Sequence, residues 1–265
     1  MPINTKRLRA SLYLAGVIAV SASFSGCSIF SQTEKDMTEG WSANKIYTTA
    51  REAMGAGDYE RAIGLYESLE ARYPLGRFAQ QAQLETAYAY YKYDEPDSAL
   101  DAIDRFLRMN PTSEDADYAY YLRGLVNFNR GHSIVDKLFP RSIADLDTVK
   151  KKESFQDFSH VITRYPNSKY AADSRERIQH LRNSLAESEV NVAKYYMVRG
   201  AWLAAFNRAE YAIKHYEGSP AIIDALEIKV KAAHNLGKPD LAADNLRVLE
   251  MNFPQRAAAL KASLR

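Results

Sequence analysis

The chain contains a single cysteine, Cys27, among its 265 residues. One cysteine excludes an intrachain disulfide, and without a second cysteine nearby it also excludes a CxxC redox pair and a zinc site built from thiolates. The five histidines never stand four residues apart, and neither an HExxH nor a GxSxG motif is present. We therefore predict no cofactor, no metal site and no catalytic activity.

The sequence also lacks an excess of charge of one sign. It has 35 Lys and Arg against 33 Asp and Glu, and only the segment Val149–Glu153, "VKKKE", is densely basic. Nucleic acids are bound through clustered cations, so we predict no nucleic acid among the partners. Asp97, Asp101 and Asp104 share one face of a predicted helix. We interpret this face as solvated, with an acid/base pair as the alternative.

Long hydrophobic runs are missing except near the N-terminus. There, Lys6, Arg7 and Arg9 precede the apolar run Leu12–Val20. A membrane-spanning helix needs about 20 apolar residues, so this run is too short to span a bilayer. Positive charge, a short apolar run and then small residues are typical of a secretory signal peptide, which we predict over residues 1–26.

The residue before the cysteine is small, as in the bacterial lipobox. Cleavage after Gly26 would make Cys27 the first residue, carrying covalent diacylglycerol and an N-linked acyl chain. The alternative is an ordinary cleaved signal with an incidental cysteine. Ser28 stands where an Asp would resemble an inner-membrane retention signal, so an outer-membrane destination is favoured. Residues 27–42 are polar and patternless, which predicts a flexible, lipidated tether.

The remaining chain is internally repetitive. Four segments carry a small residue twelve places before a proline: Ala62 and Pro74, Ala99 and Pro111, Ser154 and Pro166, Ala242 and Pro254. A second set of small or apolar residues recurs at a spacing of 37: Ala50, Ala87 and Gly124, then Ala193 and Val230. Paired amphipathic helices at this period predict an all-α tetratricopeptide-repeat (TPR) superhelical solenoid of five helix pairs.

The repeat spacing also predicts the boundaries of the two halves. The N-terminal half covers residues 43–166 and holds repeats 1–3, with an inserted loop over 131–150 where the period is broken. The C-terminal half covers 167–254 and holds repeats 4–5. It begins with a long helix, because neither Pro nor Gly interrupts residues 167–199. Residues 255–265 are predicted to be a tail.

A second stripe lies about 80–100 degrees around each first helix from its small residue. In solenoids of this kind, that face lines the concave surface, and aromatic side chains there suit an extended peptide. The alternative is that the rings only widen the core. The predicted substrate-peptide groove comprises Tyr47, Arg51, Tyr88, Tyr91, Tyr118, Tyr121 and Phe128.

Several longer segments resemble one protein family. They are "RYPLGRFAQQAQLETAYAYYK", "AIDRFLRMNP", "YYLRGL", "FQDFSHVITRYPNSKY" and "VAKYYMVRGAWLAAFNR". Together they are similar to the BamD family of outer-membrane lipoproteins, also called ComL or YfiO. The similarity extends from about Asn44 to Pro254.

The resemblance implies a lipid-anchored scaffold of the β-barrel assembly (BAM) complex at the periplasmic face of the outer membrane. Its implied partners are the barrel subunit BamA, through that subunit's periplasmic domains, the other BAM lipoproteins, and unfolded outer-membrane β-barrel proteins. Because the family binds BamA through its C-terminal repeats, we expect Arg199, Trp202 and Arg208 to form the partner interface. We expect the Arg208 guanidinium to point outward toward a carboxylate of the partner. The alternative is another periplasmic TPR lipoprotein that coordinates cell-wall synthesis or DNA uptake.

The predicted anchor leads to a direct test. We expect Cys27→Ser to release the protein from membranes, because each buried methylene of an acyl chain contributes about 0.8 kcal/mol to membrane binding. Membrane fractionation measures the release, and mass spectrometry of the mature wild-type N-terminus is its control. An unmodified Cys27, or cleavage at another residue, would contradict the prediction.

Overall fold

The computed structural model describes residues 37–130 and 144–263, so Cys27 and the predicted signal peptide lie outside the described residues. The chain divides into two units, Met1–Trp41 and Ser42–Arg265. In the first unit, residues 37–40 form a turn. All the helices described below belong to the second unit.

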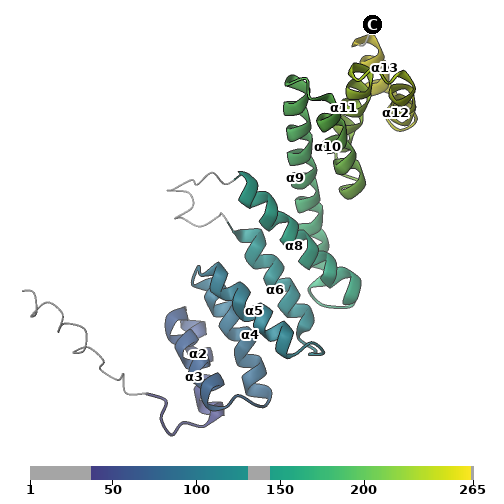
Figure 1. The fold of residues 1–265 in the computed structure, drawn as a ribbon. Coiled ribbons are helices and arrows are strands. Elements are labelled where there is room, and N and C mark those ends of the chain that lie inside the picture. The colour runs from purple at the N-terminus through teal and green to yellow at the C-terminus, as the bar shows by residue number, and fades with distance from the viewer. Residues whose placement is uncertain (1–36, 131–143, 264–265) are drawn as a thin grey trace, which may run out of the picture. The chain divides into compact units, whose positions relative to one another are not determined.

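The described residues of the second unit are helical throughout, with no β-strand among them (Figure 1). The helices are α2 (Ala43–Ala56), α3 (Tyr59–Arg72), α4 (Arg77–Lys92), α5 (Pro96–Met109), α6 (Ala116–Asn129), α8 (Ala144–Arg164), α9 (Ala171–Val198), α10 (Trp202–His215), α11 (Ile222–Asn235), α12 (Pro239–Asn252) and α13 (Pro254–Ser263). None of them is long and apolar enough to cross a bilayer.

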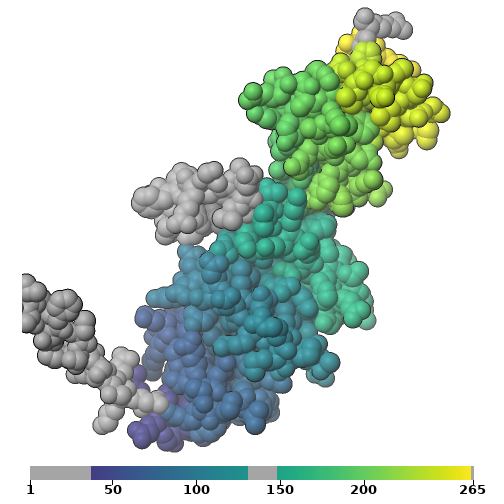
Figure 2. All heavy atoms as spheres, viewed as in Figure 1, coloured from purple at the N-terminus to yellow at the C-terminus, as the bar shows by residue number. Residues whose placement is uncertain are grey.

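Consecutive helices pack against one another in chain order, and α2 contacts α4, α4 contacts α6, and α9 contacts α11. Figure 2 shows the described atoms of the second unit following one another in chain order from purple to yellow. The five predicted pairs are α2/α3, α4/α5, α6/α8, α9/α10 and α11/α12. The fold is therefore the predicted TPR solenoid. The recurring small residues are buried, among them Ala50, Ala62, Ala87 and Ala99, except Ala242, which is half-buried.

Local sequence accounts for where the helices begin and end. Ser42 caps α2 by accepting a hydrogen bond from the Lys45 backbone N–H, and Gly57 ends α2 with a left-handed φ of 79°. The helices α3, α5, α8 and α12 each end two residues before a proline. A proline cannot continue a helix, and it disfavours the helical conformation of the residue before it.

Two predicted segments need correction. The loop predicted over 131–150 is wrong over residues 144–150, which belong to α8; residues 131–143 lie outside the described residues. The tail predicted over 255–265 is wrong because Pro254 both follows α12 and begins α13. Proline suits the first turn of a helix, and Ala257 and Leu260 bury α13 against the preceding pair. The uninterrupted 167–199 segment does form the predicted long helix, α9.

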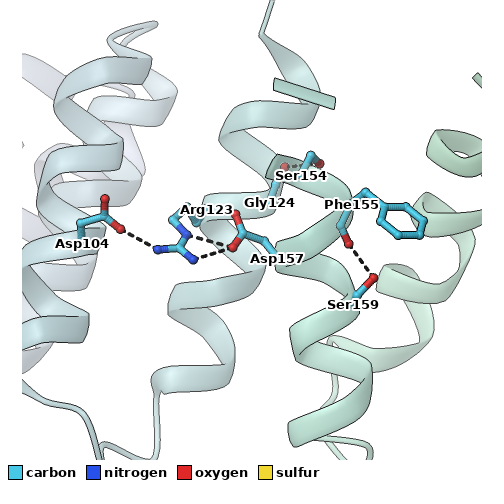
Figure 3. Close-up of polar contacts among 7 residues, drawn as sticks. All are labelled: Asp104, Arg123, Gly124, Ser154, Phe155, Asp157 and Ser159. Carbon is cyan, nitrogen blue, oxygen red and sulfur yellow. Dashed lines mark hydrogen bonds and ion pairs between the residues drawn. The ribbon is translucent and has the colours of Figure 1, made fainter. Parts of the chain in front are cut away.

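The third pair shows why a small residue recurs in these helices. A Cβ on Gly124 would lie 2.8 Å from the nearest ring carbon of Phe158, which is fully buried in α8. The hydroxyl of Ser154, also buried, donates a hydrogen bond of 2.9 Å to the Gly124 carbonyl (Figure 3). The helices α6 and α8 can approach this closely only with a hydrogen atom at position 124.

We predict that Gly124→Ala destabilises the protein by about 1–3 kcal/mol, because the added methyl group overpacks the contact with Phe158. Gly64→Ala is the matched control. Gly64 is exposed within α3, and a Cβ there would meet nothing within 4 Å. The control should stabilise the protein by about 1 kcal/mol through helix propensity. Thermal or urea unfolding measures both effects, and equal effects of the two substitutions would contradict the prediction.

Candidate functional site

A cavity of about 630 Å³ opens between α2 and α4. Tyr47 and Arg51 line it from α2, and Arg77 and Phe78 line it from the start of α4. The ring centroids of Tyr47 and Phe78 are 5.4 Å apart, and the Arg77 guanidinium lies 5.0 Å from the Phe78 centroid. Two of the predicted groove residues are thus brought together with a second cation and a second ring.

The wall behind Tyr47 is aromatic and buried. The Tyr47 and Tyr66 ring centroids are 6.0 Å apart, and Tyr66 is fully buried. The Tyr66 hydroxyl has no hydrogen-bond partner within the described part of the chain. Burial, followed by the nearby charge of Glu85, raises the pKa of Tyr66, so the hydroxyl stays protonated.

Glu85, which the sequence analysis did not single out, lies close enough to Tyr47 and Arg51 to act on them electrostatically. It lies on α4 four residues after Gln81, which lines the cavity, and three before Tyr88, so these three residues share one helix face. Burial raises the pKa of Glu85, although the charge of Arg51 opposes this shift. No ion pair or hydrogen bond joins Glu85 to another described residue. The helical spacing of Gln81 and Tyr88 was the signal that could have revealed it.

The remaining predicted groove residues are half-buried between neighbouring helices. Tyr88, Tyr91 and Tyr118 pack against the core cluster formed by α4, α5 and α6, which includes Ile103 and Phe106. Burial raises the pKa of Tyr118. The outer face of this stripe is available to a ligand, while its inner face belongs to the core.

Tyr121 and Phe128 are engaged within the chain. The Tyr121 ring stacks on Tyr170 at a centroid distance of 4.6 Å, and its hydroxyl donates a 2.8 Å hydrogen bond to Asp173. Burial, together with that hydrogen bond, raises the pKa of Tyr121 to about 12. Phe128 contacts the buried Phe158 edge-on, with centroids 6.2 Å apart. These two residues therefore join α6 to α8 and α9.

The predicted partner residues lie at the junction of α9 and α10. Arg199 caps the C-terminus of α9, and its guanidinium lies 5.2 Å from the Tyr195 ring centroid. Trp202 begins α10 and is half-buried beneath the Gly200 turn. Large apolar side chains are exposed around this turn, with Val198 at 88% and Leu203 at 61% exposure. The turn thus presents apolar and cationic groups together.

Arg208 is exposed on α10, as expected, but its guanidinium already has a partner within the chain. Its Nη1 donates a 2.8 Å hydrogen bond to Glu189, whose side chain is only 5% exposed. Lys152 of α8 contacts the other Glu189 oxygen at 3.2 Å. From its position on α10, Arg208 reaches Glu189 on α9. The buried Glu189 carboxylate is stabilised by such a cation, because an unpaired buried charge is unfavourable. A role for Arg208 at the partner interface stays a prediction.

Among the described residues, no three His, Cys, Asp or Glu side chains are arranged to hold a metal ion. The site consists of neighbouring helix faces that carry aromatic rings and charged side chains. This arrangement suits the binding of a polypeptide.

A family model and curated relatives indicate the same family. The model of the YfiO family, described as an outer membrane lipoprotein, matches residues 40–249. The outer membrane protein assembly factor BamD of Neisseria meningitidis serogroup A is 45% identical over 240 residues, covering 90% of each chain. The BamD of Vibrio cholerae is 36% identical over 239 residues, covering 90% of this chain and 97% of the relative. A TPR protein of Thermus thermophilus is 11% identical, with a TM-score of 0.37, over 84% of this chain and 97% of the other.

The helix pairs define an all-α TPR protein. The family model and the curated relatives define it further: the chain belongs to the YfiO family of outer membrane lipoproteins, whose curated members are BamD proteins.

The buried position of Glu85 leads to a prediction for stability. Its raised pKa means that the folded state holds the proton more tightly than the unfolded chain does. Stability should therefore fall as pH rises from the ordinary value of 4.5 through the raised value. We predict that Glu85→Gln, which cannot ionise, is more stable than the wild type at pH 7. The two proteins should converge in acid, below the ordinary pKa.

Thermal unfolding across this pH range measures the difference. Glu187→Gln is the control, because Glu187 is exposed on α9 and its removal deletes the same charge. The control should follow the wild type at every pH. A Glu85→Gln variant that is less stable than the wild type at pH 7 would contradict the prediction.

Proposed function

We propose that this chain acts in outer membrane protein assembly by receiving the C-terminal segments of unfolded β-barrel proteins in the groove between α2 and α4. In this proposal, the lipidated Cys27 holds the chain at the periplasmic face of the outer membrane. The names of the BamD relatives support the process. The observation that carries the substrate role is the cavity where Arg51 and Arg77 meet Tyr47 and Phe78.

Two guanidiniums and the carboxylate of Glu52 line this cavity, so its balance of charge favours a terminal carboxylate. Neither Arg51 nor Arg77 forms an ion pair within the described residues, although the charge of Arg51 acts on the nearby Tyr47 and Glu85. A guanidinium carries several N–H donors, so donors remain for a ligand. A planar guanidinium matches a carboxylate through paired hydrogen bonds. Tyr47 and Phe78 beside them offer aromatic faces to an aromatic side chain at the end of the peptide. The cavity therefore fits a peptide that ends in an aromatic residue.

The rest of the stripe suits the chain preceding that terminus. Glu85 lies next along α4 and can accept hydrogen bonds from peptide N–H groups, since no described residue donates one to it. Beyond Glu85 come three half-buried tyrosines whose outer faces would contact the peptide: Tyr88, Tyr91 and Tyr118. Tyrosine rings can contact peptides of many different sequences. An extended strand of varied composition fits such a surface.

We further propose that the turn between α9 and α10 docks the periplasmic domains of a BamA-type barrel subunit, beside other BAM lipoproteins. Exposed Val198 and Leu203 supply apolar contact area around Arg199, whose guanidinium is already positioned over Tyr195. Arginine is enriched among interface hot spots, and exposed apolar side chains around it are typical of an interaction surface. Arg208 supports this surface from behind by holding Glu189.

Two reciprocal variants test the proposal. Arg51→Gln combined with Arg77→Gln should weaken binding of a peptide ending in phenylalanine about tenfold or more, because charge-assisted hydrogen bonds contribute about 1.5–3 kcal/mol. The double variant should still co-purify with the barrel subunit. Arg199→Glu should bind the peptide normally and lose the barrel subunit. Fluorescence anisotropy and co-purification from solubilised membranes measure the two effects.

The peptide amide is the matched control, since it lacks only the terminal carboxylate. Wild type should bind the amide about as weakly as the double variant binds the free acid. The double variant should not distinguish the two peptides. If amidation weakens binding to the wild type and to the double variant equally, the carboxylate is bound elsewhere and the proposed site is wrong.

A further inference from the structure

A second cavity, of about 400 Å³, lies between α5, α6 and α8. It is lined by five carboxylates and two cations, and Leu100 is its single apolar side chain. Cavities that hold small organic ligands are lined mainly by apolar and aromatic groups. This cavity is therefore suited to a charged group. The acids Asp97, Asp101 and Asp104, interpreted above as a plain solvated face, form one wall of it.

Most of the charges in this cavity are already paired. Arg123 of α6 reaches both ways, donating at 2.6 Å to Asp104 of α5 and at 2.6 Å to the buried Asp157 of α8 (Figure 3). Lys150 pairs with Glu153, and Asp97 pairs with Arg130. These contacts connect α5, α6 and α8, and each of the two lining cations has a carboxylate partner.

Two groups in the cavity are left without a partner. Asp101 is an exposed carboxylate on α5, and no described residue pairs with it. Asn127 lines the cavity from α6 and is 4% exposed, yet its buried Oδ1 accepts no hydrogen bond. A buried acceptor without a donor costs about 1–3 kcal/mol, so an unpaired Asn127 is unfavourable for folding alone. The carboxylate and the amide both call for a donor with positive charge.

We propose that this acidic cavity docks a basic segment of a protein partner, which inserts a lysine or arginine side chain beside Asp101 and Asn127. The five acids outnumber the two lining cations and the adjacent Arg130, so the cavity is net negative and a cationic side chain complements it. A bare metal ion is a poorer occupant, because no three acidic or histidine side chains are arranged to hold one in the described chain. This surface is separate from the proposed peptide groove between α2 and α4.

The proposal is tested with the full mature protein and a labelled peptide of alternating lysine and glycine, at low ionic strength. Asp101→Asn should weaken binding about threefold to fivefold, the range for an exposed ion pair. Asp240→Asn, which removes the same charge from an exposed site on α12, should leave binding within about twofold of the wild type.

Asn127→Leu separates binding from folding. The substitution removes the unpaired amide and keeps a side chain of similar size, so thermal stability should be unchanged or higher. Peptide binding should nevertheless fall. The proposal is overturned if the peptide does not bind, or if Asp101→Asn and Asp240→Asn weaken binding equally. It is also overturned if Mg²⁺ competes with the peptide for the wild type but not for Asp101→Asn, because the cavity would then be a metal-ion site. It is also overturned if Asn127→Leu binds as the wild type does.

Discussion

The close approach of paired helices is the constraint on which the rest of this structure depends. It requires a small residue where the two helices of a pair touch, and at Gly124 even a methyl group would collide with Phe158. That contact aligns α6 with α8, and the alignment brings Arg123 within reach of carboxylates on both sides. The side chains at the faces away from the contact are then free to differ between repeats. Aromatic rings, cations and acids can each occupy their own part of the solenoid on an unchanged backbone.

The fold could be predicted from the sequence because the same constraint acts at a fixed spacing. Small or apolar residues recur 37 positions apart within each half, and four of the five helix pairs have a proline two residues past the end of the second helix. The errors occurred where that signal stops. Residues 144–150 are helical although the repeat does not cover them, and Pro254 begins a helix where it was interpreted only as a terminator. A proline is compatible with both roles, and only the burial of Ala257 and Leu260 decides between them.

The candidate sites were predicted less completely, for a different physical reason. Helical spacing indicates which face a residue occupies, and this sufficed for Tyr47 and Arg51. It does not indicate which charges find partners across helices. Arg208 was placed on the correct helix but reaches Glu189 in the preceding one, while Glu85 and Asp101 have no ion-pair partner in the part of the chain that the structure describes. Ion pairing depends on the distances between residues that are far apart in sequence. Helix packing sets these distances, and they cannot be predicted from the spacing of residues in one sequence.

The buried ion pairs of Glu189 limit which amino-acid substitutions this chain can accept during evolution. The Glu189 carboxylate is buried and held by Lys152 from α8 and Arg208 from α10, so three helices contribute to one charge balance. Loss of either cation first would leave a buried charge undercompensated, which is strongly unfavourable. Neutralising Glu189 first would instead leave two cations that are both partly exposed and tolerable. Burial therefore fixes the order in which substitutions can be accepted during evolution, because Glu189 must change before Lys152 or Arg208. We expect these three residues, at the junction between the two halves, to change slowly.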